Sequence, residues 1–220
     1  MPQGSGPKGV VRRRTSTRLV RTAKDVEHAR RLLREYREWL WHHREVTAFP
    51  DSVLQAGLAG LDHEIELLPG AYESPGGALV LGLSGTTPVG CGALRRLRRG
   101  VGEIKRVYVR PDFRGRGLGH RITGMLLGRA RSLGYQRAVL DTLPTMKSAI
   151  DLYRKMGFVP IPPYWRHPVP GALFFEYGLQ GEPARAKPRR GDDLPTPAAR
   201  ARAGPRGSRS GRAEPEGGSG

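Results

Sequence analysis

Three closely spaced glycines, Gly115, Gly117 and Gly119, constrain the fold of this chain more than any other feature. They follow the β-rich run at residues 107–109 and directly precede a segment whose apolar residues recur at helical spacing. Glycines let successive backbone N–H groups converge on one point, and a following helix adds its own N–H groups and the positive end of its dipole. The stretch therefore predicts a site for an anion such as a pyrophosphate. A tight strand-to-helix connection without a ligand is the alternative.

The chain has 220 residues, which is enough for one ordinary domain and two tails. Residues 181–220 are dominated by Gly, Pro, Arg, Ala and Ser, with Leu194 as their only large aliphatic residue. Such a segment cannot bury enough apolar surface to offset its ordering entropy, and residues 1–14 have a similar composition. We therefore predict a folded domain at residues 15–180 between two disordered tails.

The formal net charge of +18 is compatible with nucleic-acid binding. The two tails carry about eight of these charges, and the rest are distributed over the middle of the chain. A cluster of arginines leads into Gly100 as a hairpin turn would, and we expect most of this charge to be solvated surface; the cluster comprises Arg95, Arg96, Arg98 and Arg99. A basic nucleic-acid-binding module nevertheless stays open as an alternative, with non-specific contact through the tails.

The single cysteine, Cys91, excludes an internal disulfide framework and a cysteine-rich metal site, and we expect it to pack as a small core residue. The sequence predicts no bound metal. No run of eighteen apolar residues occurs, and no apolar run follows the N-terminal arginines. These features predict a cytoplasmic protein without a signal peptide or a membrane span.

The hydrophobic pattern predicts strands and helices in a mixed order. Several antiparallel strands precede the glycines, which fits poorly with a dinucleotide-binding Rossmann fold. The order predicts an α/β (α+β) domain with a mixed, mostly antiparallel sheet of about six to seven strands, about four helices and a central βαβ crossover. The expected strands are 17–22, 78–83, 88–94, 103–109, 137–141, one beginning at 158, and 172–179; the expected helices begin at Asp25, carry Leu54 to Leu68, span 119–133, and span about 146–157.

The stretch RGRGLG at 114–119 resembles the [QR]-x-x-G-x-[GA] signature of the GNAT superfamily of N-acetyltransferases, and residues 107–113 resemble its lead-in strand and turn. The element order over residues 17–179 resembles that of the family. LPGAY at 68–72 and PVGCGALR at 88–95 resemble a bacterial subgroup of unassigned substrate. The resemblance implies acetyl-CoA as cosubstrate, without a metal, held by Val107, Tyr108, Val109, Arg114, Gly115, Arg116, Gly117, Leu118 and Gly119.

The same resemblance implies direct acetyl transfer to a primary amine in a ternary complex, with three chemical roles. Glu103 corresponds to a general base; the alternative is an ordinary ion pair with Lys105 or Arg106. Tyr153 corresponds to a general acid near the sulfur of CoA; its alternative is core packing. The backbone N–H of Val109 corresponds to the donor that stabilises the oxyanion.

The acceptor site is less determined by sequence. Asp141 ends a predicted strand and could attract a cationic amine or cap a turn. Tyr72, Trp165 and His167 lie in predicted loops that could wall the acceptor pocket. The acceptor could be a small molecule or a peptide, and a homodimer is compatible with the sequence. A CoA-binding protein without catalysis is a further alternative.

Overall fold

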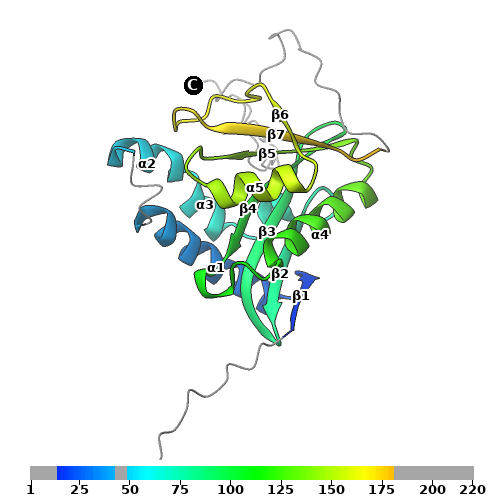
Figure 1. Cartoon of the computed structure of the whole chain (residues 1–220). Coiled ribbons are helices and arrows are strands. Elements are labelled where there is room, and N and C mark those ends of the chain that lie inside the picture. The colour runs from blue at the N-terminus through cyan, green and yellow to red at the C-terminus, as the bar shows by residue number, and fades with distance from the viewer. Residues whose placement is uncertain (1–13, 43–48, 181–220) are drawn as a thin grey trace, which may run out of the picture.

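The structure, a computed structural model, describes residues 14–42 and 49–180 (Figure 1). The predicted tails at 1–14 and 181–220 lie outside the described residues, apart from Arg14. The predicted mixed, mostly antiparallel sheet is confirmed. Its seven strands follow the order β1-β2-β3-β4-β5-β7-β6. The strands are β1 (Thr15–Leu19), β2 (Ala78–Ser84), β3 (Thr87–Arg98), β4 (Val101–Val109), β5 (Arg137–Thr142), β6 (Val159–Ile161) and β7 (Leu173–Gly178).

Helices cover both faces of this sheet. The apolar core on one face contains residues of α4 and α5, and the core on the other face contains residues of α1, α2 and α3. In Figure 1, α4 and α5 lie in front of the sheet. The α-helices are α1 (Ala23–His42), α2 (Asp51–Leu58), α3 (Leu61–Glu66), α4 (Leu118–Ser132) and α5 (Lys147–Lys155), and the short 3-10 helices are η1 (Gly70–Tyr72) and η2 (Pro111–Phe113).

Local sequence sets the start of α1. The backbone N–H of Asp25 donates to Thr22 Oγ1 at 3.2 Å, and the N–H of Thr22 donates to Asp25 Oδ2 at 3.3 Å. This reciprocal pair is a capping box, which satisfies two N–H groups that the helix itself leaves without a partner. The helix begins two residues earlier than the sequence pattern predicts.

The single helix expected from Leu54 to Leu68 is wrong in one respect, because α2 and α3 are separate helices divided at Ala59 and Gly60. The apolar residues Leu54, Leu58, Leu61 and Ile65 are nevertheless all buried, as a continuous helix would have placed them. Gly60 caps the start of α3 and disfavours helix continuation by about 1 kcal/mol relative to alanine. Hydrophobic periodicity therefore indicated the buried face but not the break.

Glycines in β3 allow α4 to approach the sheet closely. A Cβ atom on Gly92 would lie 2.5 Å from Ile122 Cγ2 and 3.0 Å from Leu126 Cδ1. A Cβ atom on Gly90 would lie 2.7 Å from the carbonyl oxygen of Tyr108. Any larger residue at these positions would displace α4 or β4, since protein interiors are already close-packed.

The neighbouring parallel strands β4 and β5 separate after a short contact. They pair only from Val101 with Arg137 to Glu103 with Val139, although β4 continues to Val109 and β5 to Thr142. On its other edge β4 carries a bulge, because Arg106 and Val107 both lie opposite Gly92. Arg106 has a φ of 58°, which is uncommon for a residue with a side chain. The strands therefore open a gap in the sheet beside this bulge.

Most of the arginine cluster lies in β3 and not in the expected hairpin turn. β3 runs through Arg98, so that only Arg99 and Gly100 make the turn to β4. Arg96 and Arg98 are exposed as expected, whereas the side chain of Arg95 is only 19% exposed because it forms an ion pair with the buried Glu103.

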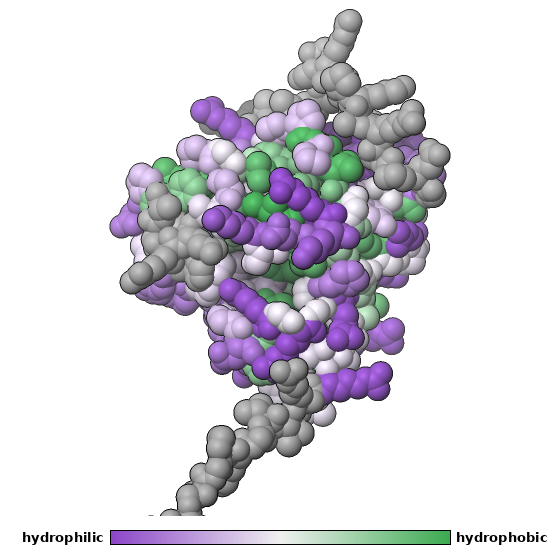
Figure 2. Space-filling model, viewed as in Figure 1, coloured by the Kyte–Doolittle hydropathy of each residue, from purple (hydrophilic) through white to green (hydrophobic). Residues whose placement is uncertain are grey.

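The view in Figure 2 shows a largely hydrophilic face with a smaller group of hydrophobic side chains near α5. Within the described part of the chain, none of the helices has the length and apolar character needed to cross a membrane.

Candidate active site

The predicted anion-binding turn connects η2 to α4, and two of its three glycines are needed for its backbone conformation. Gly115 and Gly117 have φ values of 71° and 72°, and a Cβ atom on either would meet no atom within 4 Å. Gly117 is the residue that precedes the first turn of α4. Because the left-handed region is costly for residues with a Cβ, conformation rather than packing explains both glycines.

Gly119 has a different structural reason. A Cβ atom there would lie 3.2 Å from Leu152 Cδ2, so this glycine sets the distance between α4 and α5. The first N–H groups of α4 have no acceptor within the helix, by the geometry of helices. The turn can therefore present several backbone donors and the positive end of a 15-residue helix to an anion.

Two arginines connect this turn to α1. Arg114 donates from Nε to the carbonyl oxygen of Val109 at 2.9 Å, and its guanidinium lies 4.4 Å from the ring centre of Trp39. Arg110 makes two hydrogen bonds of 2.7 Å to the carboxylate of Glu35. The side chain of Arg114 thus packs back against β4 and α1. Its predicted role toward a cofactor remains a prediction.

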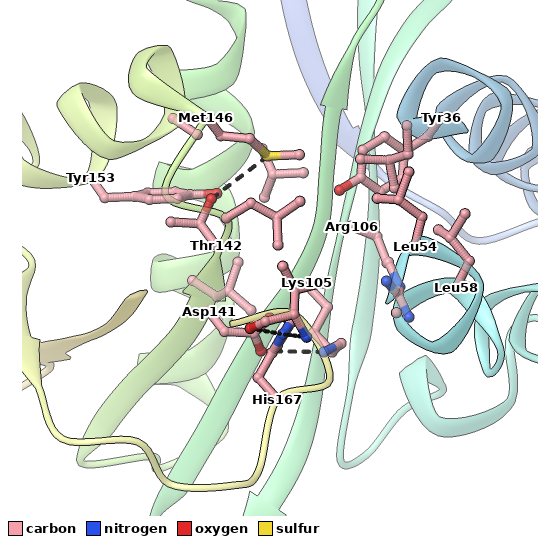
Figure 3. A pocket seen from close by; sticks show the side chains of 17 residues that line it. Tyr36, Leu54, Leu58, Lys105, Arg106, Asp141, Thr142, Met146, Tyr153 and His167 are labelled. Carbon is pink, nitrogen blue, oxygen red and sulfur yellow. Dashed lines mark hydrogen bonds and ion pairs between the residues drawn. The ribbon is translucent and has the colours of Figure 1, made fainter. Parts of the chain in front are cut away.

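A cavity of about 110 Å³ lies beside the gap between β4 and β5. Figure 3 shows Tyr36, Leu54 and Leu58 on one side of it and Met146 and Tyr153 on the other. One part of the cavity wall is apolar, and the other carries charged groups from the two strands. The lining residues are Tyr36, Leu40, Leu54, Gly57, Leu58, Ile104, Lys105, Arg106, Val107, Asp141, Thr142, Leu143, Met146, Ala149, Tyr153, His167 and Val169.

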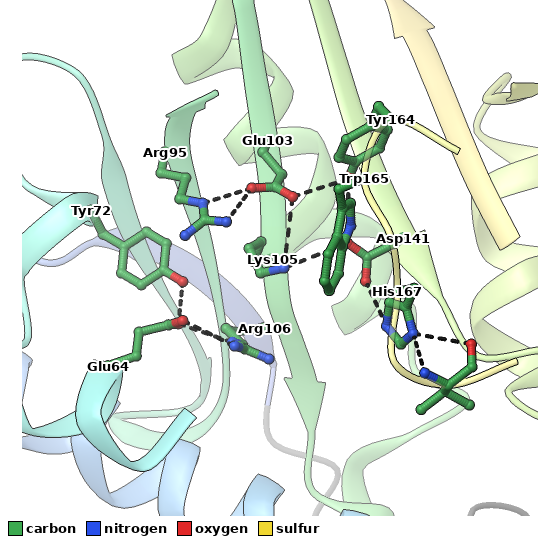
Figure 4. A network of polar contacts seen from close by, with 11 residues as sticks. Glu64, Tyr72, Arg95, Glu103, Lys105, Arg106, Asp141, Tyr164, Trp165 and His167 are labelled. Carbon is green, nitrogen blue, oxygen red and sulfur yellow. Dashed lines mark hydrogen bonds and ion pairs between the residues drawn. The ribbon is translucent and has the colours of Figure 1, made fainter. Parts of the chain in front are cut away.

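Asp141 lies at the polar end of this cavity and has four neighbours (Figure 4). Its Oδ1 atom lies 3.3 Å from Tyr164 Oη, 3.3 Å from Trp165 Nε1 and 3.5 Å from Lys105 Nζ. Its Oδ2 atom lies 3.6 Å from His167 Nε2. Burial by itself would raise the pKa of Asp141, but the charge of Lys105 and the other donors outweigh it and hold the pKa below the ordinary value.

Glu103 lies behind Asp141 and is completely buried. Arg95 donates to its Oε2 from Nε and approaches it with Nη2, both at 2.6 Å. Its Oε1 accepts a hydrogen bond from Tyr164 Oη at 3.1 Å and lies 3.7 Å from Lys105 Nζ. The expected alternative partner Lys105 is therefore present, and Arg95 rather than Arg106 is the close one. Glu103 does not line the cavity.

A second, partly buried ion pair holds Arg106. Its Nε and Nη2 atoms each donate to the carboxylate of Glu64 at 2.9 Å, and Tyr72 donates to the same carboxylate. Burial alone would raise the pKa of Glu64, but Arg106 lowers it below the ordinary value. Tyr72, predicted as a loop residue on the acceptor pocket, lies in η1, is buried and does not line this cavity.

The ring of His167 is oriented by the chain that follows it. The backbone N–H of Val169 donates to Nδ1 at 3.0 Å, the carbonyl oxygen of the same residue lies 3.3 Å from Nδ1, and Nε2 faces Asp141. Burial lowers the pKa of His167 below its ordinary value, although Asp141 opposes this change. His167 is therefore neutral at neutral pH.

The structure brings together some of the predicted site residues and separates others. Val107, Asp141 and Tyr153 line the cavity, and burial raises the pKa of the Tyr153 hydroxyl. Trp165 contacts Asp141 without lining the cavity. Sequence reasoning missed the contributions of Tyr36 and Tyr164, and it did not place Lys105 in the cavity wall. Three charged residues within four positions of a central strand, at 103, 105 and 106, were the available signal of a buried polar network.

Across residues 14–42 and 49–180, no group of three or more His, Cys, Asp or Glu side chains is placed to hold a metal ion. Cys91 is buried, as expected, and burial raises the pKa of its thiol. The polar network of Figure 4 therefore consists of hydrogen bonds and ion pairs between protein groups.

Curated relatives match part of the chain. An uncharacterized N-acetyltransferase from Schizosaccharomyces pombe is 38% identical over 89 residues, which are 40% of this chain and 55% of that protein. The IAA acetyltransferase from Azospirillum brasilense is 40% identical over 105 residues, or 46% of this chain and 67% of the relative. The matched region thus spans little more than half the length of the first relative.

Solved structures share the fold over a longer range. The paia N-acetyltransferase from Thermoplasma acidophilum, in complex with coenzyme A, superimposes with a TM-score of 0.59 at 14% identity and covers 75% of this chain and 99% of its own. An acetyltransferase from Streptococcus agalactiae gives 0.58 at 17% identity, with 74% and 96% covered. A model of the acetyltransferase (GNAT) family matches residues 26–158, which is more than half of the chain. The expected resemblance is confirmed, and the chain belongs to the acetyltransferase (GNAT) family.

Proposed function

We propose that this protein transfers an acetyl group from acetyl-CoA to a primary amine by direct attack in a ternary complex. The amine nitrogen forms a bond to the thioester carbonyl carbon, the carbon–sulfur bond breaks, and its electron pair goes to the sulfur. An ammonium substrate loses two protons in all, one of which ends on the CoA thiol. Membership of the GNAT family supports acyl transfer from acetyl-CoA.

The observation that carries this proposal is the joint position of the turn and the cavity. Both adjoin β4: the cavity lies beside its bulge and contacts Val107, and the turn follows its end through η2. Backbone donors at the start of α4 suit the pyrophosphate of CoA. A cosubstrate held there could extend along β4 to an amine in the cavity, so that positioning would supply much of the rate acceleration.

Two groups are proposed to stabilise the reaction. The N–H of Arg110 donates to the carbonyl oxygen of Val89 in β3, so strand alternation turns the N–H of Val109 toward the side where β5 diverges. We assign this N–H to the oxyanion. Tyr153 would donate to the leaving sulfur, since its raised pKa keeps it protonated.

The amine needs a route for its proton, because an amine with a pKa near 10.4 is mostly protonated at neutral pH. Glu103 remains the predicted general base. It would have to act through Tyr164, whose hydroxyl contacts both Glu103 Oε1 and Asp141 Oδ1. Asp141 would receive the N–H groups of the bound amine directly. Relatives of this chain include an IAA acetyltransferase and an amino-acid acetyltransferase, so the proposed reaction is stated for primary amines in general.

The test is a calorimetric titration with acetyl-CoA of the wild type, Gly117→Asp and Gly128→Asp. Aspartate tolerates the left-handed backbone of Gly117 and places a negative charge where the pyrophosphate would bind. Gly128 is an exposed residue of the same helix with no atom within 4 Å of an added Cβ, so its variant is a matched control. We expect Gly117→Asp to weaken binding at least about tenfold, because a close like charge costs more than 1.4 kcal/mol.

Wild-type binding followed by amine-dependent release of CoA thiol would support the enzyme. Binding without thiol release across a set of amines would favour a CoA-binding protein without catalysis. No binding by the folded wild type would contradict the proposal and bring the nucleic-acid alternative forward. Circular dichroism of all three proteins controls for folding.

A further inference from the structure

The cavity also carries information about the acceptor. We propose that the acceptor is a free α-amino acid with an apolar side chain, of about the size of leucine. This inference rests on the proposed acetyl transfer and specifies its substrate class. It is argued from the charges, distances and size of the cavity.

The ion pairs made by residues on and next to β4 differ in distance. Arg95 with Glu103, Arg106 with Glu64 and Arg110 with Glu35 approach to 2.6, 2.9 and 2.7 Å. These distances are typical of tight charge-assisted hydrogen bonds. The contacts of Asp141 in the cavity are all 3.3 Å or longer, and Lys105 lies 3.5 and 3.7 Å from its two carboxylates. Asp141 and Lys105 are thus held loosely, and both line the cavity.

The charges at the cavity leave one opposite pair for a ligand. The charge of Glu103 is matched by Arg95 and that of Arg106 by Glu64, while His167 is neutral because of its lowered pKa. Lys105 and Asp141 remain, with opposite charges. An ammonium group suits Asp141, and a carboxylate suits the ammonium of Lys105, which has three donors.

The short distance between Lys105 and Asp141 limits how far apart the two charges of a ligand can be. Lys105 Nζ and Asp141 Oδ1 are only 3.5 Å apart. A ligand that contacts both must carry its ammonium and carboxylate close together, as on the single α-carbon of an amino acid. A chain with its amine at the far end, or a peptide N-terminus without an adjacent carboxylate, could not place a carboxylate on Lys105 while its ammonium contacts Asp141.

The remaining wall and the volume describe the side chain. Across from the charged groups, α1 and α2 contribute Tyr36, Leu40, Leu54 and Leu58 to the lining. The cavity measures about 110 Å³. One water needs about 10–15 Å³ on such a measure, so the cavity holds roughly seven to eleven non-hydrogen atoms. Leucine fits this number, whereas a second ammonium group of a polyamine would meet Lys105 and Arg106.

The experiment measures CoA thiol release by the full chain at saturating acetyl-CoA with three amines. Leucine carries both charges on one carbon, 6-aminohexanoate has the same atoms with its charges far apart, and leucinamide lacks the carboxylate. We expect kcat/KM for leucine to exceed that for each of the others by about tenfold or more, because each loses a charge-assisted contact. Equal or faster turnover of 6-aminohexanoate or leucinamide would overturn the inference.

A variant separates recognition from a merely structural role of Lys105. Lys105→Met removes the charge and keeps the length, and Lys147→Met makes the same change at an exposed position of α5. We expect Lys105→Met to raise KM for leucine roughly ten- to hundredfold and to leave KM for leucinamide within about twofold. A parallel loss on both amines would show a structural role and contradict the inference.

These experiments distinguish a failure of the substrate inference from a failure of the proposed acetyl transfer. If the wild type binds acetyl-CoA and acetylates other amines but does not prefer leucine, only the substrate inference fails. If it binds no acetyl-CoA, the proposed reaction fails. Calorimetric binding of leucine against 6-aminohexanoate then tests the cavity without turnover, and equal affinity for the two overturns the inference.

Discussion

The two faces of the sheet around β3 and β4 differ in how they are stabilised. On the face toward α4, glycines and apolar side chains bring the helix close to the strands, with Gly92 next to Ile122 and Leu126. On the opposite face, β3 and β4 carry the charges of the buried Glu103 and of the partly buried Arg95 and Lys105. The face toward α4 is stabilised by close packing, whereas the opposite face is stabilised by the pairing of its charges. The difference shows that one strand can support a helix and also supply a polar site.

The largest effect should come from breaking the tight pair on the polar face. Arg95→Met leaves the completely buried Glu103 without its closest partner, and we expect a loss of about 3–5 kcal/mol in the free energy of unfolding. Urea unfolding measures it. Arg96→Met, an exposed neighbour in the same strand, is the matched control and should change stability by less than about 0.5 kcal/mol. Similar values for both variants would contradict the described role of Arg95.

The packed face should respond to added volume. Gly92→Ala places a Cβ atom 2.5 Å from Ile122 Cγ2, a β-branched position with little freedom to move. We expect a loss of about 1–3 kcal/mol in the free energy of unfolding from overpacking. Gly128→Ala, at an exposed position of α4, should instead raise stability by up to about 1 kcal/mol through helix propensity. A neutral Gly92→Ala would show that α4 can shift away from β3.

The smallest effect should come from the loosely held carboxylate. Lys105 and the other donors outweigh burial and lower the pKa of Asp141, so its charged form stabilises the fold above the ordinary pKa, near 3.9, and this contribution is lost as the pH falls through the lowered value. Asp141→Asn should therefore cost about 1 kcal/mol or less at pH 7, and the difference from the wild type should shrink below about pH 4.

Urea unfolding at pH 7 and pH 3 measures this change. Asp151→Asn, at an exposed position of α5, is the control and should show no comparable pH-dependent difference. A cost for Asp141→Asn as large as that of Arg95→Met would remove the distinction between tight and loose pairs.

The sequence predicted the sheet, the crossover and the glycine turn because each depends on local patterns. Alternation, helical spacing and positive-φ glycines are properties of short stretches, such as Gly115 and Gly117 before α4. The break between α2 and α3 was missed since both halves bury the same face. The bounds of some elements differ from the predicted ones by a few residues; for example, β1 spans Thr15–Leu19 and not residues 17–22.

The polar site could be predicted only in part. Glu103 and Asp141 were visible as charged residues on strands, but the contacts that join them depend on Tyr164 and Lys105. Tyr164 lies 61 residues after Glu103 and 23 residues after Asp141 along the chain. Which carboxylate lines a cavity depends on where two strands diverge. That divergence follows from the packing of the whole sheet, and no local pattern encodes it.

The bulge at Arg106 changes the alternation of side chains between the two faces of β4. In a regular strand, neighbouring residues project to opposite sides, so two adjacent cations could not share one wall. Here one extra residue interrupts that parity, and Lys105 and Arg106 both border the same cavity. If the side chains of β4 are assigned to the two faces of the sheet by alternation from Val101, the middle residues fall on one face. If they are assigned from Val109, the same residues fall on the other face. Removing one residue at this position would therefore restore regular alternation along β4: both ends of the strand would keep their pairing with β3, but the strand could no longer place two neighbouring cations on one wall.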